Sequence, residues 1–591
     1  MMKFSEFHKK IRNILDIDLP AAGPVINEGR LMAEDVEIGR TAFMDKVGLA
    51  SEVEYKKACI REKKVMYHAH IGMGSWQATA EALNTLYQNS REMGFKVDRA
   101  GICLDRRMGL PAKFRDIVPA ETGPMLTSPE AWIQVGSAAP IQPHMGDFMI
   151  GFPASTENTL NALRAGVTTI GNLSQYFAHE VPMWHDHVRT TFETIRALSL
   201  MGALRDRGTL IHSYLEDGYA ALFSDCATIA GWALLERYIV EDLLGGKLSH
   251  CIGGLTVDPV KRVGWVFALH EIHQHDCLGS MFYGDTISFT HNLVANQALV
   301  SEYLLWDIMA QFECPTGHAV LPLPVSEAIR TPSAEEIADA QNLGHRVEDT
   351  ARRLYPHMNF DLSHEFARIV TAEGKTVFDN AMAGFKEAGV DVCDPIKLLY
   401  LLKRLGPGLF EEMFGAGKID VAYLRGRKPV VMTDVFEAST TFLKHYRQSI
   451  VEHVQNRTLA GRRFLIASSD VHEHAILIIN QILTEVGAEI TYLGAEKNPD
   501  TVVTEARRHK VEAILLSTHN GMALEYARKV KAELNKQHLK IPVIMGGVLN
   551  QKFEDQALPV NVFSDLKELG FFPYKSLDGK LTPFLDFKEE E

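Results

Sequence analysis

The chain has 591 residues, which is too long for one ordinary hydrophobic core, so two or three domains are expected. Apolar residues make up 46% and charged residues 23%, the composition of a globular protein rather than of a disordered or fibrous one. The chain has 61 basic and 75 acidic residues, a formal charge of -14, with the basic residues scattered, so we expect no nucleic-acid partner and no anionic membrane surface.

The N-terminus lacks the apolar core of a secretory signal, and no stretch reaches the roughly 18 apolar residues that span a bilayer. We therefore expect a cytoplasmic protein whose partner is a small-molecule substrate. Its seven cysteines are widely spaced and form no Cys-x-x-Cys pair, which predicts reduced thiols and no zinc or iron–sulfur site made of cysteines. Whether the chain forms a homodimer is left open.

Four regions are expected along the chain: a helical N-terminal extension at 1–60, an α/β region at 61–330, a helical segment at 331–455 and a second α/β region at 456–591. In the helical segment, Ser333 and Glu336 have the spacing of a capping box that opens a helix. Pro407-Gly408 is expected to break another helix of that segment.

Residues 61–330 alternate short β-rich runs with longer helical stretches, the pattern of a parallel sheet with crossover helices. The runs that favour strands are 64–72, 97–105, 131–136, 147–155, 167–175, 208–217, 247–256 and 279–286. Eight strand–helix units predict a (β/α)8 TIM-type barrel, although the third unit has almost no helix.

In such a barrel the chemistry lies at the carboxyl ends of the strands and in the loops that follow them. Polar side chains gather at these positions: His68, His70, Asp105, Arg106, Ser155, Asn158, Asn172, Gln175, His212, Glu216, Asp258 and Asp285. Polar residues at the start of a loop are also ordinary helix caps, so most of them have a purely structural alternative.

Residues 456–591 predict a doubly wound, flavodoxin-like domain. Strands at 463–469, 488–494, 511–517 and 541–547 alternate with helices near 473–486, 499–509 and 521–537. Ligands of such sheets bind beyond the carboxyl ends of the strands. The unusual residues fall there: Asp470, His472, Ser517, His519, Gly546 and Gly547.

Three segments at this rim resemble the Asp-x-His-x-x-Gly, Ser-x-Leu and Gly-Gly elements of the cobalamin-binding domains that hold their cofactor with its nucleotide tail removed from cobalt: Asp470-Val-His472-Glu-His474-Ala475, Ser517-Thr-His519 and Gly546-Gly547. The resemblance implies that His472 is the lower axial ligand of cobalt. A neutral imidazole is a good nitrogen donor, and the Asp470 carboxylate can accept its other ring proton. By the same resemblance Ser517 lies near that histidine and the buried tail, while Gly546 and Gly547 leave room for the nucleotide.

Two positions depart from the family pattern. Ala475 replaces the usual glycine and His519 the usual leucine, but neither change removes a donor to cobalt. Two alternatives remain at this point: His472 merely caps a helix, or His472 and His474 form a zinc pair with His519 as a further ligand.

Residues 147–262 are similar to the large catalytic subunit of adenosylcobalamin-dependent glutamate (methylaspartate) mutase. The similar pieces are the Pro-Ala-Ser-x-x-Asn turn from Pro153 to Asn158 and the stretches 165–177, 210–214 and 225–250. The resemblance implies an adenosylcobalamin-dependent radical mutase, an isomerase that rearranges the carbon skeleton of a small acid or amino acid. The catalytic barrel and the cobalamin domain would then be fused in one chain.

In that mutase interpretation the cofactor supplies the radical chemistry, while the protein orients the substrate and excludes water. The resemblance implies that His212 hydrogen-bonds the substrate, with Gln175 and Asn158 beside it. Glutamate mutases grip two carboxylates with several arginines, whereas here only Arg106 or Arg107 stands near a matching strand end. A substrate other than glutamate is therefore expected, with fewer carboxylates.

Two other classes of protein remain as alternatives. His68-x-His70, with His212, His250 and Asp285 on later strands, resembles the metal site of amidohydrolases, where imidazoles and a carboxylate activate water. That family's bridging lysine on strand four has no evident counterpart, and the hydrolase interpretation leaves the C-terminal domain unexplained. A corrinoid carrier or sensor is the other alternative, and it would give the polar rim of the barrel no role.

Overall fold

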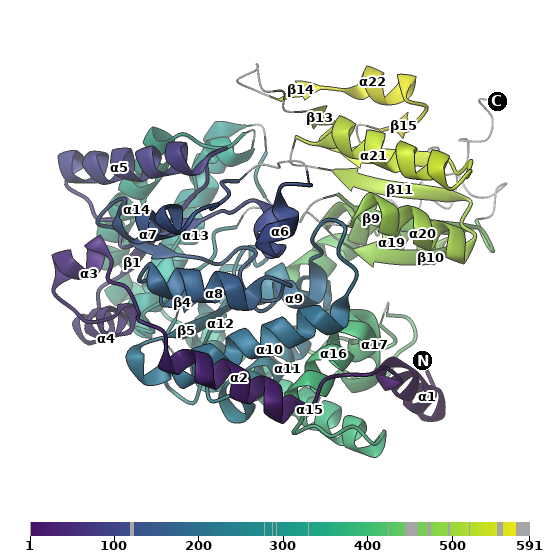
Figure 1. Ribbon diagram of the computed structural model, residues 1–591, viewed down its shortest axis with the longest axis horizontal. Coiled ribbons are helices and arrows are strands. Elements are labelled where there is room, and N and C mark those ends of the chain that lie inside the picture. Colours follow the sequence, from purple (N-terminus) through teal and green to yellow (C-terminus); the bar gives the residue numbers. More distant parts are fainter. Residues whose placement is uncertain are drawn as a thin grey trace. The chain divides into compact units, whose positions relative to one another are not determined.

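A computed structural model describes most of the chain, and its elements are labelled in Figure 1. The described residues are 2–118, 123–276, 278–279, 281–285, 288–290, 292–328, 330–423, 425–441, 444, 459–469, 474–494, 497–518, 521–551, 553 and 559–574. The chain forms two compact units. The first contains the residues up to Phe177 and Trp184–Asp434, and the second contains Ala178–Met183 and the described residues from Val435 onward.

The described part of the first unit contains eight short strands, and all of their pairings are parallel. A five-stranded sheet has the order β3-β2-β1-β8-β7, and a three-stranded sheet has the order β4-β5-β6. The strands are β1 (Met66–Ile71), β2 (Arg99–Ile102), β3 (Gln142–His144), β4 (Thr169–Ile170), β5 (Leu210–Tyr214), β6 (Leu248–Cys251), β7 (Met281–Phe282) and β8 (Ala319–Val320).

Hydrogen bonds connect the two sheets at both edges of the smaller one. Beside β4, the amide of Gly171 donates to the carbonyl of Met145 at 3.0 Å, next to a parallel bridge between Met145 and Ile170. Beside β6, the amide of Tyr283 donates to the carbonyl of Ile252 at 3.0 Å. The eight strands therefore follow one another in chain order through these links.

Two of the expected strands are wrong. Residues 131–136 lie in helix α7 (Pro129–Ser137), where the Ser128 side chain accepts a hydrogen bond from the amide of Ala131. This Ser-Pro helix start outweighs the apolar run that favoured a strand. Residues 147–155 are not a strand either: β3 ends at His144, and helix α8 (Ser155–Arg164) begins at their end.

The eighth strand of the first unit was not expected from the sequence. β8 (Ala319–Val320) pairs with β1 and with β7, and it is only two residues long. A run this short gives no periodic signal of its own.

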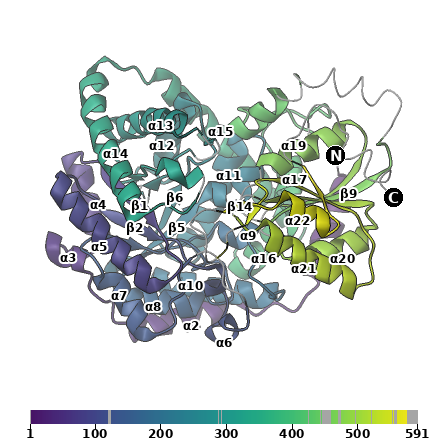
Figure 2. The ribbon, with the colours of Figure 1, turned by 90° about the horizontal axis from the view of Figure 1, so that it is seen from above.

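Helices surround these strands: α1 (Phe4–Leu15), α2 (Ala22–Glu34), α3 (Ala42–Val47), α4 (Glu52–Glu62), α5 (Trp76–Met93), α6 (Ala112–Arg115), α9 (Gln175–Ala178), α10 (His187–Ala203), α11 (Cys226–Arg237), α12 (Pro259–Ile272) and α13 (Leu293–Glu313). Helix α2 lies along α10 (Figure 1), and a side chain at Gly29 would come within 2.4 Å of the Arg196 carbonyl oxygen. Helices α12 and α13 are neighbours in Figure 2. This close approach of backbones buries the apolar faces of the helices.

The expected helical segment contains α14 (Ala334–Leu354), α15 (Asp361–Glu387), α16 (Pro395–Leu405) and α17 (Pro407–Phe414). The capping box is confirmed, because Ser333 and Glu336 exchange both of its hydrogen bonds. The break at Pro407 is confirmed too: α16 ends at Leu405, Gly406 has a φ of 80°, and α17 begins at Pro407.

The second unit is built on a parallel sheet of five strands in the order β10-β9-β11-β12-β15. The strands are β9 (Arg463–Ser468), β10 (Glu489–Gly494), β11 (Ala513–Thr518), β12 (Val543–Gly547) and β15 (Phe572–Pro573), with a small hairpin of β13 (Asn550–Gln551) and β14 (Val560–Asn561). The order 2-1-3-4-5 is that of flavodoxin-like folds, as expected. Strand β15 was not expected.

Helices cover both faces of this sheet: α19 (His474–Glu485), α20 (Pro499–His509), α21 (Ala523–Lys536) and α22 (Phe563–Glu568). Leu465 and Leu516 belong to one core cluster together with residues of α20, α21 and α22. The adjacent residues Phe464 and Leu515 pack instead with residues of α19. Strands that are apolar on both faces are therefore explained by a doubly wound sheet.

Among the described residues, no helix is long and apolar enough to cross a membrane.

Candidate functional site

The carboxyl ends of three strands meet at one rim of the second unit. Ser468 of β9 is paired with Ser517 of β11, which is paired in turn with Gly546 of β12. The amide of Ser469, the residue after β9, donates to the Ser517 carbonyl at 2.9 Å. Because the strands are parallel and in register, the loops that leave them begin side by side, where ligands of such sheets bind.

The rest of the expected cobalamin site begins in these loops. Asp470 and His472 follow β9 directly, and His519 follows β11, but all three lie outside the described residues. Their roles, including that of His472 as cobalt ligand, stay predictions.

The two glycines at the end of β12 have different constraints. Gly547 has a φ of +94°, and a Cβ there would lie 2.2 Å from the Thr518 carbonyl oxygen, so the backbone itself requires glycine. A Cβ at Gly546 would meet no described atom nearer than the Tyr574 carbonyl oxygen, at 3.8 Å. With respect to the described residues, Gly546 therefore leaves space at the rim that a side chain would fill, beside the buried Ser517. Bare backbone at this point fits a group that passes close to the sheet.

Four histidine side chains form a row inside the first unit. His68 and His70 come from β1, His144 from β3 and His212 from β5. The ring centroids are 5.0 Å apart between His70 and His68, 5.7 Å between His68 and His144, and 4.7 Å between His144 and His212. Since β5 belongs to the smaller sheet, both sheets contribute to the same interior. We call these four residues the histidine row.

The members of the histidine row are neutral at physiological pH. Burial lowers the pKa of all four, that of His70 to about 4, and the nearby positive charge of Arg99 adds to the effect. A neutral imidazole donates one hydrogen bond and accepts another. His70 already uses Nδ1 with the Tyr283 hydroxyl at 3.0 Å. The row can therefore bind polar groups, but it supplies no positive charge to a carboxylate.

Two amide side chains at the end of β4 converge on one carboxylate. Asn172 and Gln175 donate to Asp217 Oδ2 at 2.9 and 2.8 Å. The Gln175 carbonyl oxygen accepts from the amide of Phe148 at 3.0 Å, and its nitrogen lies 3.4 Å from Asp147 Oδ1. The structure thus places Gln175 between two carboxylates, with each of its polar atoms engaged by protein.

Asn158 lies deeper and is fully buried. Its amide nitrogen donates to the carbonyls of Met108 and Phe148 at 2.7 and 3.2 Å, and its oxygen accepts from Arg115 at 2.9 Å. These bonds tie two loops together and use both hydrogens of the amide. The geometry gives Asn158 a structural role, and contact with substrate stays a prediction.

Arg106 stands at the start of a short 3-10 turn after β2 (Arg106–Gly109) and is half-buried. Its neighbour Arg107 is committed to Asp105, with Nε 2.8 Å from Oδ1. Of the two arginines considered for a substrate carboxylate, Arg107 is therefore held by protein, and the role of Arg106 stays a prediction.

Of the histidines expected of an amidohydrolase, His68, His70 and His212 lie in the histidine row, but His250 does not join them. His250 has its Nε2 3.2 Å from Glu236 and its Nδ1 2.9 Å from His273 Nε2, in a separate buried cluster. Within the described ranges no group of three or more His, Cys, Asp or Glu side chains is arranged to hold a metal ion. The described residues therefore do not assemble that metal site.

Sequence reasoning missed several residues of the interior. His144 lies on a strand that was not recognised, because Pro143 interrupts the run. The Tyr214 and Tyr283 rings stack with centroids 4.6 Å apart, next to His70. Asp217 was missed although it directly follows Glu216, which was singled out in the sequence. No other feature of the sequence distinguishes Asp217 from its neighbours.

The comparisons with known proteins concern the second unit. Residues 465–563 match the family described as the B12 binding domain. The chain is 32% identical over 84 residues to glutamate mutase sigma subunit 1 of Haloarcula marismortui, a match that covers 14% of this chain and 56% of that protein. The chain thus spans about half the length of this curated relative. The C-terminal unit contains a B12-binding domain.

A solved structure, a novel cobalamin-binding protein from Desulfitobacterium hafniense, matches 21% of this chain and 56% of that chain. The sequence identity is 20% and the TM-score is 0.17, so this likeness carries no argument here.

Proposed function

We propose that this chain is an adenosylcobalamin-dependent radical mutase, a cobalamin-dependent isomerase that rearranges the carbon skeleton of a small acid or amino acid. The observation that carries the proposal is the B12-binding domain at 465–563, together with its similarity to a subunit of glutamate mutase. Bound adenosylcobalamin would supply the radical chemistry.

The rim of the second unit supports binding of the cofactor. His472 would bind the cobalt of the cofactor, and Asp470 would fix the tautomer of the His472 imidazole. Ser517 and the backbone at Gly546 would line the path of the nucleotide tail, and Gly547 would keep that backbone in place. His519 would stand at the same rim.

We further propose that the two sheets of the first unit are arcs of one (β/α)8 barrel. Two observations support this closure. Backbone hydrogen bonds join the sheets at Gly171–Met145 and at Tyr283–Ile252, and both sheets contribute to the histidine row. The carboxyl ends of the strands would then form the substrate site. His212 would hydrogen-bond the substrate, with Gln175 and Asp217 fixing the adjacent wall.

The charges near the carboxyl ends of these strands favour a substrate that differs from glutamate. The histidine row is neutral, and Arg107 is committed to Asp105. Asp147 and Asp217 lie on either side of Gln175. A substrate with one carboxylate, which Arg106 would bind, fits this balance better than a dicarboxylate does.

The test is to mix the full chain with adenosylcobalamin and a panel of monocarboxylic and dicarboxylic amino acids and acids. We expect one of them to produce a cobalt-coupled radical signal in electron paramagnetic resonance, together with an isomerised product. Cobalamin binding without radical or product across the panel, but with transfer of a methyl group or a response to light, would replace the mutase by a carrier or a sensor. A stoichiometric divalent metal in the purified chain without any corrinoid binding would favour a hydrolase.

A further inference from the structure

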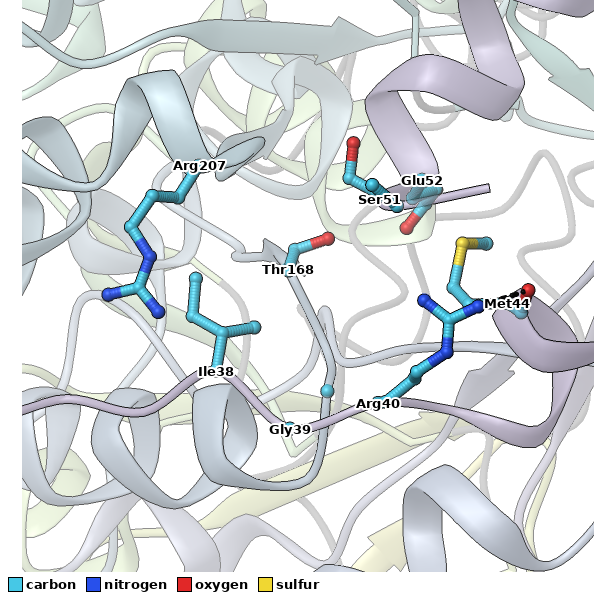
Figure 3. A pocket seen from close by; sticks show the side chains of 10 residues that line it. Ile38, Gly39, Arg40, Met44, Ser51, Glu52, Thr168 and Arg207 are labelled. Atoms are coloured by element: carbon cyan, nitrogen blue, oxygen red, sulfur yellow. Dashed lines mark hydrogen bonds between the residues drawn. The ribbon is translucent and has the colours of Figure 1, made fainter. Parts of the chain in front are cut away.

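A cavity of about 250 Å³ lies in the first unit, at the amino ends of β4 and β5 (Figure 3). Gly166 and Thr168 line it just before β4, and Arg207 lines it just before β5. The remaining wall comes from the chain before α3, from Met44 within α3 and from the start of α4. Chemistry on parallel sheets belongs to the carboxyl ends of the strands, so this cavity is separate from the proposed substrate site.

Two side chains of the cavity have hydrogen-bonding capacity to spare. The Thr168 hydroxyl is buried, since the residue is only 4% exposed, and it has no hydrogen-bond partner among the described residues. Figure 3 shows Thr168 between Ile38 and the start of α4, with its hydroxyl toward the start of α4. Arg207 donates from Nη1 to the Val36 carbonyl at 2.9 Å, which leaves other guanidinium hydrogens available. A buried hydroxyl without a partner is costly unless a ligand or water completes it.

The start of α4 adds donors on the same side. Ser51 caps this helix by accepting from the amide of Glu54 at 3.3 Å, so its hydroxyl hydrogen can be donated. The free amides of a first helical turn and the helix dipole favour a negative group there.

The charges already present at the cavity are balanced. Glu52 has its carboxylate 2.8 Å from Arg99 and 3.7 Å from Lys56, and it accepts from Thr169 at 2.7 Å. Arg40 pairs with Asp45 and donates to the carbonyls of Met44 and Leu49. Its charge is therefore already compensated, and the side chain only lines the cavity. Arg207 is thus the cation that remains for a ligand among the described lining residues.

We propose that this cavity binds a small oxyanion, a phosphate or carboxylate group on a short organic body. Arg207, Thr168 and Ser51 donate to the oxyanion. Ile38 and Met44 supply an apolar wall for the organic part, and the volume exceeds what an oxyanion alone would fill. Glu52, in the wall of the cavity, is ion-paired with Arg99.

The test uses inorganic phosphate and butyrate as separate probes of the full chain at constant ionic strength. Phosphate binding is followed by phosphorus NMR line widths, and butyrate binding by saturation-transfer proton NMR. We expect saturable binding of at least one probe, with about a tenfold weaker affinity in Arg207→Gln, because a charge-assisted hydrogen bond is lost. Thr168→Val, which keeps the shape and removes the hydroxyl, should weaken binding as well.

Arg205→Gln is the matched control, because this exposed arginine is in the same 3-10 turn (Arg205–Arg207) and does not line the cavity. Binding of butyrate alone would identify a carboxylate ligand, and binding of phosphate alone a phosphate ester. No saturable binding of either probe would overturn the proposal. An affinity equally reduced in Arg205→Gln, or unchanged in both Arg207→Gln and Thr168→Val, would overturn it too.

Discussion

The two glycines at the end of β12 offer a paired test of the cobalamin site. Gly547→Ala places a methyl group 2.2 Å from the Thr518 carbonyl oxygen on a residue with a φ of +94°. The positive φ costs about 1–2 kcal/mol, and the backbone movement that relieves the contact costs about 1–3 kcal/mol more. We therefore expect the second unit to lose about 2–5 kcal/mol of its free energy of unfolding.

Gly546→Ala is the matched variant. Its methyl group would lie 3.8 Å from the nearest described atom, so we expect a change in stability within about 0.5 kcal/mol. The same methyl group would occupy space proposed for the nucleotide tail. Cobalamin affinity should therefore fall while the fold remains intact.

Hydrogen-exchange mass spectrometry of the peptides that cover β11 and β12 measures the local stability, and titration by absorbance measures cobalamin binding. All six tryptophans lie between Trp76 and Trp306, so their fluorescence monitors the first unit as an internal control. Unchanged exchange in Gly547→Ala would refute the steric reasoning. Full cobalamin affinity in Gly546→Ala would remove that glycine from the cofactor site.

The remaining predictions concern the histidines. His472→Ala should weaken cobalamin binding or convert the cobalamin spectrum from the histidine-ligated form. His509→Ala, which changes an exposed residue of the same unit, should do neither. Equal spectra of the two variants would refute the ligand assignment. His212→Ala should retain cobalamin and abolish turnover of the true substrate, and a retained kcat would exclude it from the catalytic residues. His70 and His273 should each destabilise the chain as the pH falls from about 6.5 toward 4, whereas Glu411 and Asp307, whose pKa values burial raises to about 7 and about 6, contribute in the opposite direction. Burial lowers the pKa of His70 and of His273 to about 4 in the folded state, so the unfolded chain binds more protons in that window. Each of the two histidines should cost about 1 kcal/mol at pH 5.5 relative to pH 7.5, measured by urea unfolding as the difference in pH dependence between the chain and its His70→Gln or His273→Gln variant. The same pH dependence in chain and variant would show that the ring is not held neutral.

The cobalamin domain could be predicted from the sequence because its signals are local. Strands β9, β10, β11 and β12 are continuous apolar runs separated by helices of ordinary length, and their sheet has the strand order of the expected flavodoxin-like fold. The motif residues fall at strand ends, where a parallel sheet collects them whatever the details of packing. Strand β15 was missed because a two-residue edge strand has no period to detect.

The first unit depended far more on its tertiary structure. Its strands are as short as two residues, so an apolar helix such as α7 looked like a strand, while β8 gave no local signal at all. The sequence did place His68 and His70 on one strand and His212 on another, although His68 and His212 lie within β1 and β5 rather than at their ends. Only the folded chain decided that His144 joins them and that His250 turns away toward Glu236, because side-chain direction alternates along a strand and depends on the register.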